Sequence, residues 1–96
     1  MTTNEVQMSI NDVFEALSHP VRRKILALLR KAPMSAGELA EHFDIAKPTL
    51  SVHFAKLKDA DLVSVERRGT SLIYHLNMSI LEEALSGFLA FKEPKE

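Results

Sequence analysis

The sequence predicts a mainly α-helical domain with a single β-hairpin, in the order helix, helix, helix, helix, strand, strand, helix. Apolar residues recur at spacings of three and four across most of the chain, which is the period of amphipathic helices. Residues 71–77 instead alternate apolar and polar side chains, which is the period of a half-buried strand. Gly69 precedes this alternation and supplies the backbone freedom that a tight hairpin turn needs.

The size of the chain favours one domain that associates with a second copy. Its 96 residues are too few for two independent cores, and 46% of them are hydrophobic. A core this small cannot bury every apolar stripe, so dimerisation is expected. We assign residues 9–92 to the domain, and we expect a flexible N-terminus at residues 1–8 and a frayed tail at residues 93–96.

The composition excludes several kinds of protein. Without cysteine, the chain has no disulfide frame, no thiolate metal site and no thiol redox switch. No apolar run approaches the roughly 18 residues of a membrane-spanning helix, and the N-terminus lacks the layout of a signal peptide. We therefore expect a cytoplasmic protein that does not insert into membranes.

The positive charges are clustered, although the formal net charge of the chain is only −1. Residues 20–31 hold five Lys or Arg and no acid, and residues 45–75 hold five against three acids. Such clusters are typical of nucleic-acid-binding surfaces, but any single cluster is more often an ordinary solvated face. Charge alone leaves both interpretations open.

Two helices are predicted in the first third of the chain. Ser9 followed by Asp12 favours a helix start. The apolar stripe of this helix comprises Ile10, Val13, Phe14 and Leu17. His19 and Pro20 end it, and Pro20 is well placed as the first residue of the second helix. The residues that the second helix is expected to bury are Val21, Ile25, Leu28 and Leu29, and those expected outside are Arg22, Arg23 and Lys24.

A short third helix and a longer fourth helix follow. Ser35 is a capping residue, Glu38 can reach back to it, and Met34 can pack onto Leu39 as a staple. The third helix is expected to bury Leu39, Ala40 and Phe43. The fourth helix is predicted from about Pro48 to Asp59, with Leu50, Phe54 and Leu57 buried.

Two paired strands and a last helix complete the chain. Residues 62–67 and 71–77 are predicted to pair around the turn Arg68-Gly69-Thr70. In the second strand one face comprises Leu72, Tyr74 and Leu76. The last helix is predicted from Ile80 to about Lys92.

The fourth helix has an outer face of mostly short side chains. The residues turned away from the core on a helical wheel are Pro48, Val52, Ala55 and Asp59. The residues flanking them are Thr49, Ser51 and Lys56, with His53 at the boundary of the face. Such a helix can lie deep in the major groove of DNA, which is about 12 Å wide.

The chemistry of this face suits DNA. Thr49 and Ser51 can bond base edges or phosphates, and Val52 can touch a thymine methyl group. Lys56 suits a phosphate. The alternative is a solvated amphipathic helix without a partner, but the helix before it and the hairpin after it favour the groove.

Cations lie near the start of this helix and at the hairpin tip. Neither Ala46 nor Lys47 is a good N-cap, so a phosphate oxygen could accept the first amides, with Lys47 beside it. Arg67 and Arg68 precede Gly69 at the tip, where they could contact the DNA backbone or the minor groove. The alternative is a hairpin whose edge is kept soluble by charge.

Three stretches resemble the ArsR-type winged helix-turn-helix repressors: ALSHPVRRKILALL, SAGELAEHFDIAKPTLSVHFAKLKDADLV and ERRGTSLIYHLN. The resemblance covers about residues 12 to 90 and is closest to the small metal-free, SdpR-like autorepressor branch. It implies a homodimer that binds an operator of approximate twofold symmetry and represses transcription by blocking polymerase. The DNA contacts that it implies near the start of the fourth helix are Lys47, Thr49, Ser51 and Val52. Val52 departs from the polar residue often found there, and Ala46 departs from the usual small polar cap.

Metal sensing is not implied for this chain. The position of the family's thiolate pair corresponds to Ser35-Ala36-Gly37, which offers no such ligand. The family's other site needs an Asp-x-His pair with further His or Glu on the last helix, and residues 80–92 contain no His. The four histidines are scattered over different predicted elements, at His19, His42, His53 and His75. We expect neither a metal nor another cofactor.

The apolar stripe of the last helix is wider than one small core can cover. It comprises Ile80, Leu81, Ala84, Leu85, Phe88, Leu89 and Phe91. Part of it is predicted to meet a second copy together with Ile10, Phe14 and Leu17. Such a pair would place the fourth helix of each copy in successive major grooves of the DNA. It could instead pack wholly within one copy, or hold a helix of a signalling partner protein.

The function favoured is a dimeric transcriptional repressor that binds double-stranded operator DNA. The alternative is a winged-helix module that docks on another protein and never reads DNA, which the low net charge and the apolar Val52 favour. An enzyme is disfavoured, because the chain has no cysteine nucleophile, no pocket motif of paired acids, no phosphate-binding glycine loop and no HExxH motif.

Overall fold

The computed structural model describes residues 10–91, with the side chains of residues 10–90. In chain order the elements are α1 (Ile10–Leu17), α2 (Pro20–Lys31), β1 (Met34–Ser35), α3 (Ala36–Ala40), α4 (Lys47–Asp59), β2 (Val63–Arg68), β3 (Ser71–Leu76) and α5 (Met78–Phe91). The predicted winged helix-turn-helix order is confirmed, with β1 as an addition. The expectations for Ser9, Lys92, residues 1–8 and residues 93–96 lie outside the described residues.

The strands form one antiparallel sheet in the order β1-β3-β2. β2 and β3 are the predicted hairpin, in which Val65 lies opposite Tyr74. On the other side of β3, Met34 of β1 pairs with Tyr74, and this third strand was not predicted. Two residues are too few to show a period-2 pattern, so only the pairing itself reveals the strand.

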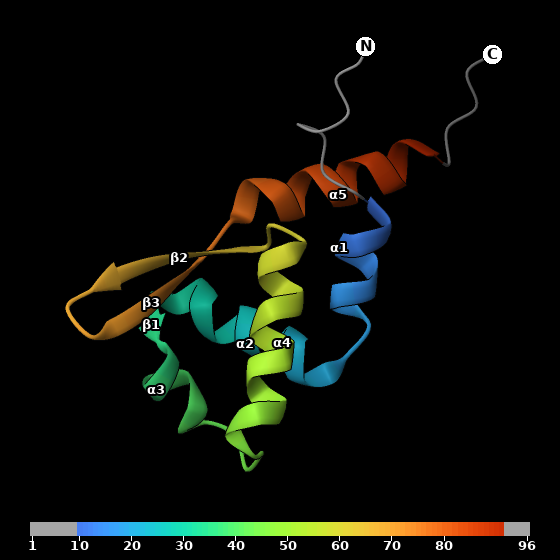
Figure 1. The fold of residues 1–96 in the computed structure, drawn as a ribbon. Coiled ribbons are helices and arrows are strands. Elements are labelled where there is room, and N and C mark those ends of the chain that lie inside the picture. Colours follow the sequence, from blue (N-terminus) through green and yellow to red (C-terminus); the bar gives the residue numbers. More distant parts are fainter. Residues whose placement is uncertain (1–9, 92–96) are drawn as a thin grey trace.

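The β2–β3 hairpin projects from a body of helices (Figure 1). α5 lies along one side of this body and packs against α1, while α4 packs against α1, α2 and β2. Among the described residues, no helix combines the length and the apolar character that crossing a bilayer requires.

The helix starts follow the predicted local signals. Pro20 opens α2, and the Nδ1 atom of His19 accepts a hydrogen bond from the Val21 amide over 3.1 Å. The predicted capping box of α3 is confirmed: the Glu38 amide donates to Ser35 Oγ over 3.0 Å, and the Ser35 amide donates to Glu38 Oε1 over 2.8 Å.

The end of α4 sets the path into the hairpin. Asp61 takes a left-handed backbone conformation with φ of 61°. Its amide donates to the Lys58 carbonyl over 2.9 Å, and the Leu62 amide donates to the Leu57 carbonyl over 3.0 Å. These two bonds are a Schellman motif, which stops the helix and turns fully buried Leu62 into the core.

The core draws one or more large side chains from nearly every helix. Its largest fully buried members are Val13, Ile25, Leu39, Leu50, Leu57 and Leu62. The predicted buried face of α2 was wrong in one respect: Leu28 is only partly buried, and Leu26 is buried in its place. The buried face of α2 therefore lies about a quarter turn from the predicted one and includes position 22.

Arg22 was expected in solvent, and the structure corrects this, because its exposed fraction is only 7%. Its Nε donates to the Ala16 carbonyl over 2.8 Å, and its Nη2 donates to the Glu15 carbonyl over 3.1 Å. The last carbonyls of a helix have no partner within it, and here a cation of α2 satisfies those of α1. The neighbouring Arg23 adds a bond of 2.7 Å to the Leu17 carbonyl.

Candidate nucleic-acid interface

The outer face of α4 is exposed in the predicted direction. Leu50, Phe54 and Leu57 point into the core. The exposed residues of the face and its flanks are Lys47, Pro48, Thr49, Ser51, Val52, Ala55, Lys56 and Asp59. Val52 is 58% exposed, so its methyl groups are accessible to a partner on this face.

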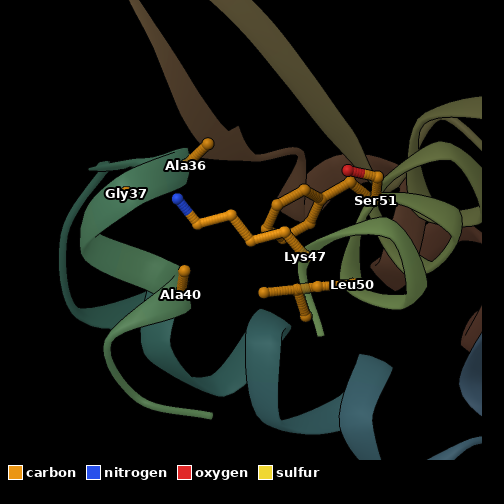
Figure 2. A pocket seen from close by; sticks show the side chains of 7 residues that line it. Ala36, Gly37, Ala40, Lys47, Leu50 and Ser51 are labelled. Atoms are coloured by element: carbon orange, nitrogen blue, oxygen red, sulfur yellow. The ribbon is translucent and has the colours of Figure 1, made fainter. Parts of the chain in front are cut away.

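The start of α4 is open to a ligand for its amides. α4 begins at Lys47, one residue before the predicted start, and the cap residue Ala46 makes no side-chain hydrogen bond to it. Figure 2 shows the Lys47 side chain reaching from α4 over a cavity toward α3, and this cavity of about 150 Å³ is lined mainly by apolar residues. The uncapped amides and the ammonium together form a cationic end on α4.

His53 does not belong to the exposed face. Its exposed fraction is 7%, and its Nδ1 atom lies 3.0 Å from Nη1 of Arg22. The wheel position of His53 was at a boundary, and the approach of α2 brings it inside. We therefore leave His53 out of the DNA-contacting residues that we propose below.

Lys56 is exposed but already paired. Its Nζ lies 2.7 Å from Oε2 of Glu15, with side-chain exposures of 45% and 58%. The hydrogen bond from Lys56 and its charge lower the pKa of Glu15. A phosphate that binds Lys56 must therefore compete with this carboxylate, which sequence analysis did not anticipate.

The hairpin tip carries the two predicted arginines. Gly69 has φ of +61° and open space around its Cα, so the turn requires the backbone freedom of glycine. Arg67 and Arg68 are exposed at the end of β2. The Nε of Arg68 lies 3.0 Å from one carboxylate oxygen of Glu66, and the other oxygen lies 3.0 Å from Nε2 of His75.

Glu66 is the second acid that sequence analysis missed. Hydrogen bonds from Arg68 and then His75 lower its pKa, so the carboxylate stays charged. Glu66 and Arg68 share one face of β2, so their spacing of two was a usable signal. Glu15 gave no such signal, because it lies 41 residues from Lys56 along the chain.

Comparisons with known proteins agree with this geometry. A family model described as a helix-turn-helix domain matches residues 17–66. The transcriptional repressor SdpR of Bacillus subtilis is 45% identical over 82 residues, which is 85% of this chain and 91% of SdpR. The chain belongs to the ArsR-type winged helix-turn-helix family. The arsenical resistance operon repressor of Staphylococcus xylosus is 37% identical over 73 residues, covering 76% of this chain and 70% of that protein.

A solved structure extends the family likeness to the whole fold. A crystal structure of an ArsR family transcriptional regulator has a TM-score of 0.80 and 28% identity, and covers 97% of this chain and 93% of the other. These ArsR-type proteins are transcriptional regulators and not enzymes.

The surface of α1 and α5 keeps an apolar patch exposed. The exposed fractions are 41% for Ile10, 43% for Leu85, 50% for Phe88 and 58% for Leu89. The rings of Phe14 and Phe88 lie 5.4 Å apart. A Cβ at Gly87 would come within 3.3 Å of Ile10 Cδ1, so the two helices approach closely there.

The remaining predicted interface residues face the chain's own core. Leu17, Ile80 and Leu81 are partly buried against it. The Ala84 side chain is fully buried, and the Phe91 side chain lies outside the described residues. The predicted stripe is thus divided between the core and the surface, and what covers the exposed part stays a prediction.

The histidines are less scattered than their sequence positions indicated. The rings of His19 and His53 lie 4.4 Å apart, because the junction of α1 and α2 meets α4. Within residues 10–91, no cluster of three or more His, Cys, Asp or Glu could hold a metal ion. His42 and His75 belong to other parts of the surface.

Proposed function

We propose that this ArsR-type protein is a DNA-binding transcriptional repressor that acts in the cytoplasm as a homodimer on an inverted-repeat operator. Its relatives carry the same helix-turn-helix domain and include named transcriptional repressors. The observation that carries the proposal is the exposed, short-chained face of α4 beside a hairpin tip with two arginines. A helix of this shape fits the major groove, and a basic tip fits the adjoining backbone or the minor groove.

The contacts divide by chemistry. Thr49, Ser51 and Val52 are proposed to read base edges, since they are short and exposed on one side of α4. Lys47, the first amides of α4 and Lys56 are proposed to bind phosphates. At the hairpin, the proposed contact residues are Arg67, Arg68 and the backbone at Gly69.

The exposed apolar patch supports a homodimer. Ile10, Leu85, Phe88 and Leu89 form a surface that a second copy can cover by twofold symmetry. Such a pair would present two α4 helices about one DNA turn, roughly 34 Å, apart. We propose an operator that is an inverted repeat of matching spacing, and the promoter of the chain's own gene is the first candidate.

We also propose that repression is independent of a metal. Within the described residues no group of ligand-forming side chains is suited to a metal ion, and the chain contains no cysteine. Relief of repression would then need another signal, such as a protein that binds the exposed patch.

The test is selection of bound fragments from random and genomic DNA, followed by gel-shift titration of the enriched sites. Enrichment of one inverted repeat with affinity that falls steeply with salt supports the proposal. Binding that is weak and equal for all sequences contradicts it.

A second function is favoured by one observation. Val52 on α4 and Leu72 at the hairpin are apolar and 58% and 38% exposed, which suits a protein partner. A protein captured through this face that remains bound after nuclease treatment, together with no enriched DNA site, would favour an interaction module.

A further inference from the structure

Arg22 links two parts of the molecule that the proposed function uses separately. Its guanidinium is buried and bonds the carbonyls of Glu15 and Ala16 at the end of α1. Its third bond, from Nη1 over 3.0 Å, reaches Nδ1 of His53 on α4. One side chain therefore ties α1, which carries part of the exposed apolar patch, to the helix proposed to read DNA.

The contact with Arg22 specifies the protonation state of His53. A guanidinium has only donors, so Nδ1 of His53 must be an acceptor without a proton. The His53 ring is therefore neutral in this arrangement, with its ring proton on Nε2.

The surroundings of His53 oppose a positive charge on it. Burial lowers its pKa, and the nearby His19 and Arg22 lower it further. Glu15 of α1 and Lys56 of α4 also lie near this junction and neutralise each other in an ion pair of 2.7 Å. Arg23 of α2 adds a further positive charge, bonded to the Leu17 carbonyl over 2.7 Å. Protonation would turn Nδ1 into a donor facing the Arg22 donor, and would leave two cations in contact.

We propose that Arg22 and His53 are positioning residues for DNA recognition, and that they hold α4 in its reading position only while His53 is neutral. The inference rests on the proposed function. A homodimer presents two α4 helices at a separation that must match the DNA pitch, so loosening each α4 from α1 weakens binding of the inverted repeat more than binding of unrelated DNA. Operator affinity should then fall on acidification, opposite to the gain that extra positive charge normally brings.

The experiment compares three variants of the full chain with the wild type, on the selected operator and on unrelated DNA. His53→Asn keeps an oxygen acceptor for Arg22 and cannot titrate, whereas His53→Leu removes the acceptor. His42→Asn is the matched control, because His42 is exposed. Affinities are measured by fluorescence anisotropy at constant ionic strength, at pH 7.5 and at about pH 5. The lower value lies well below an ordinary histidine pKa of about 6.5, because the pKa of His53 is itself lowered.

The expected results separate positioning from general charge. Wild type and His42→Asn should bind the operator about tenfold more weakly at the lower pH, the factor that loss of one charged hydrogen bond implies. His53→Asn should bind the operator well at both pH values. His53→Leu should bind it weakly at both pH values, while its circular dichroism spectrum remains that of the folded protein. If His53→Leu does not fold, the proposal is still tested by comparing how the operator affinities of His53→Asn and of the wild type change with pH.

A readout without DNA accompanies these titrations. Nitrogen NMR of the His53 ring should show the proton on Nε2 at neutral pH, and a proton on Nδ1 would overturn the inference. The same pH profile in His53→Asn and wild type would also overturn it, with the proposed function intact. Wild type that binds no site selectively at pH 7.5 would instead overturn the proposed function, and the inference with it.

Discussion

Lys56 and Glu15 are joined by an ion pair of 2.7 Å between Nζ and Oε2, although 41 residues separate them in the chain. The pair connects α4 to α1 at the edge of the proposed DNA surface. The same carboxylate that steadies Lys56 in the free protein would oppose its approach to a phosphate. Because both side chains are exposed, the ion pair can separate and each charge can be hydrated at a small cost in free energy.

Replacing Glu15 by Gln should therefore strengthen operator binding. We expect a gain of a few-fold at low salt, because Lys56 becomes available and one repulsive charge is lost. The measurement is an anisotropy titration at several salt concentrations. Glu83→Gln, which removes the same charge from the exposed side of α5, should leave affinity nearly unchanged. Equal gains in both variants would mean that only net charge matters.

Arg68→Ala should flatten the salt dependence of operator binding by about one ion per subunit of the proposed dimer. The reason is that the arginine would leave Glu66 for a phosphate when DNA is bound. The slope of log affinity against log salt measures this. Lys31→Ala, at the end of α2, removes the same charge from an exposed residue outside the proposed contacts and serves as the control. An unchanged slope for Arg68→Ala would place the hairpin tip away from the DNA.

Val52→Glu and Leu89→Glu should have complementary effects. Both side chains are 58% exposed, so neither change opens a large cavity. Val52→Glu should abolish operator binding and leave the dimer intact, because it sets an acid against the groove. Leu89→Glu should split the dimer, because it buries a charge in the proposed interface. Light scattering and gel-shift titration distinguish the two, and a monomeric wild type would contradict the dimer.

The stability of the fold should fall on mild acidification. The pKa of His53 is lowered in the folded state, so the unfolded chain binds more protons once the pH falls below the ordinary value of about 6.5. The contribution of neutral His53 to the free energy of unfolding is therefore fully present above that value. This contribution is lost as the pH falls through the lowered pKa. Urea unfolding between pH 7.5 and 5 should show the loss in wild type and less of it in His53→Asn.

Asp61→Gly should stabilise the protein. Asp61 has φ of 61°, a left-handed conformation that costs a residue with a side chain about 1–2 kcal/mol and costs glycine little. The greater freedom of glycine in the unfolded chain offsets part of this, so we expect a net gain of about 0.5–1 kcal/mol. Asp61→Val should be destabilising by a similar or larger amount. Urea midpoints at neutral pH measure both, and a loss for glycine would show that the Asp61 side chain has a stabilising role.

Much of the fold followed from local signals along the chain. Helix starts at Pro20 and Ser35 depend on residues within three positions, and those signals are complete in the sequence. The inward direction of α4 also needed only its own periodicity, with Leu50, Phe54 and Leu57 at helical spacing. The hairpin turn at Gly69 was recognisable for the same reason.

Other features of the fold and of the proposed interface could not be predicted from the sequence, because they depend on tertiary contacts. Burial of Arg22, the contact of His19 with His53, and the pairing of β1 with β3 arise only where distant elements meet. A periodic pattern reports which side of a helix is apolar, but it carries no information about which polar group on another element will face it. Arg22 is charged and therefore looks exposed in any such pattern, while the unsatisfied carbonyls at the end of α1 and the ring of His53 make its burial favourable.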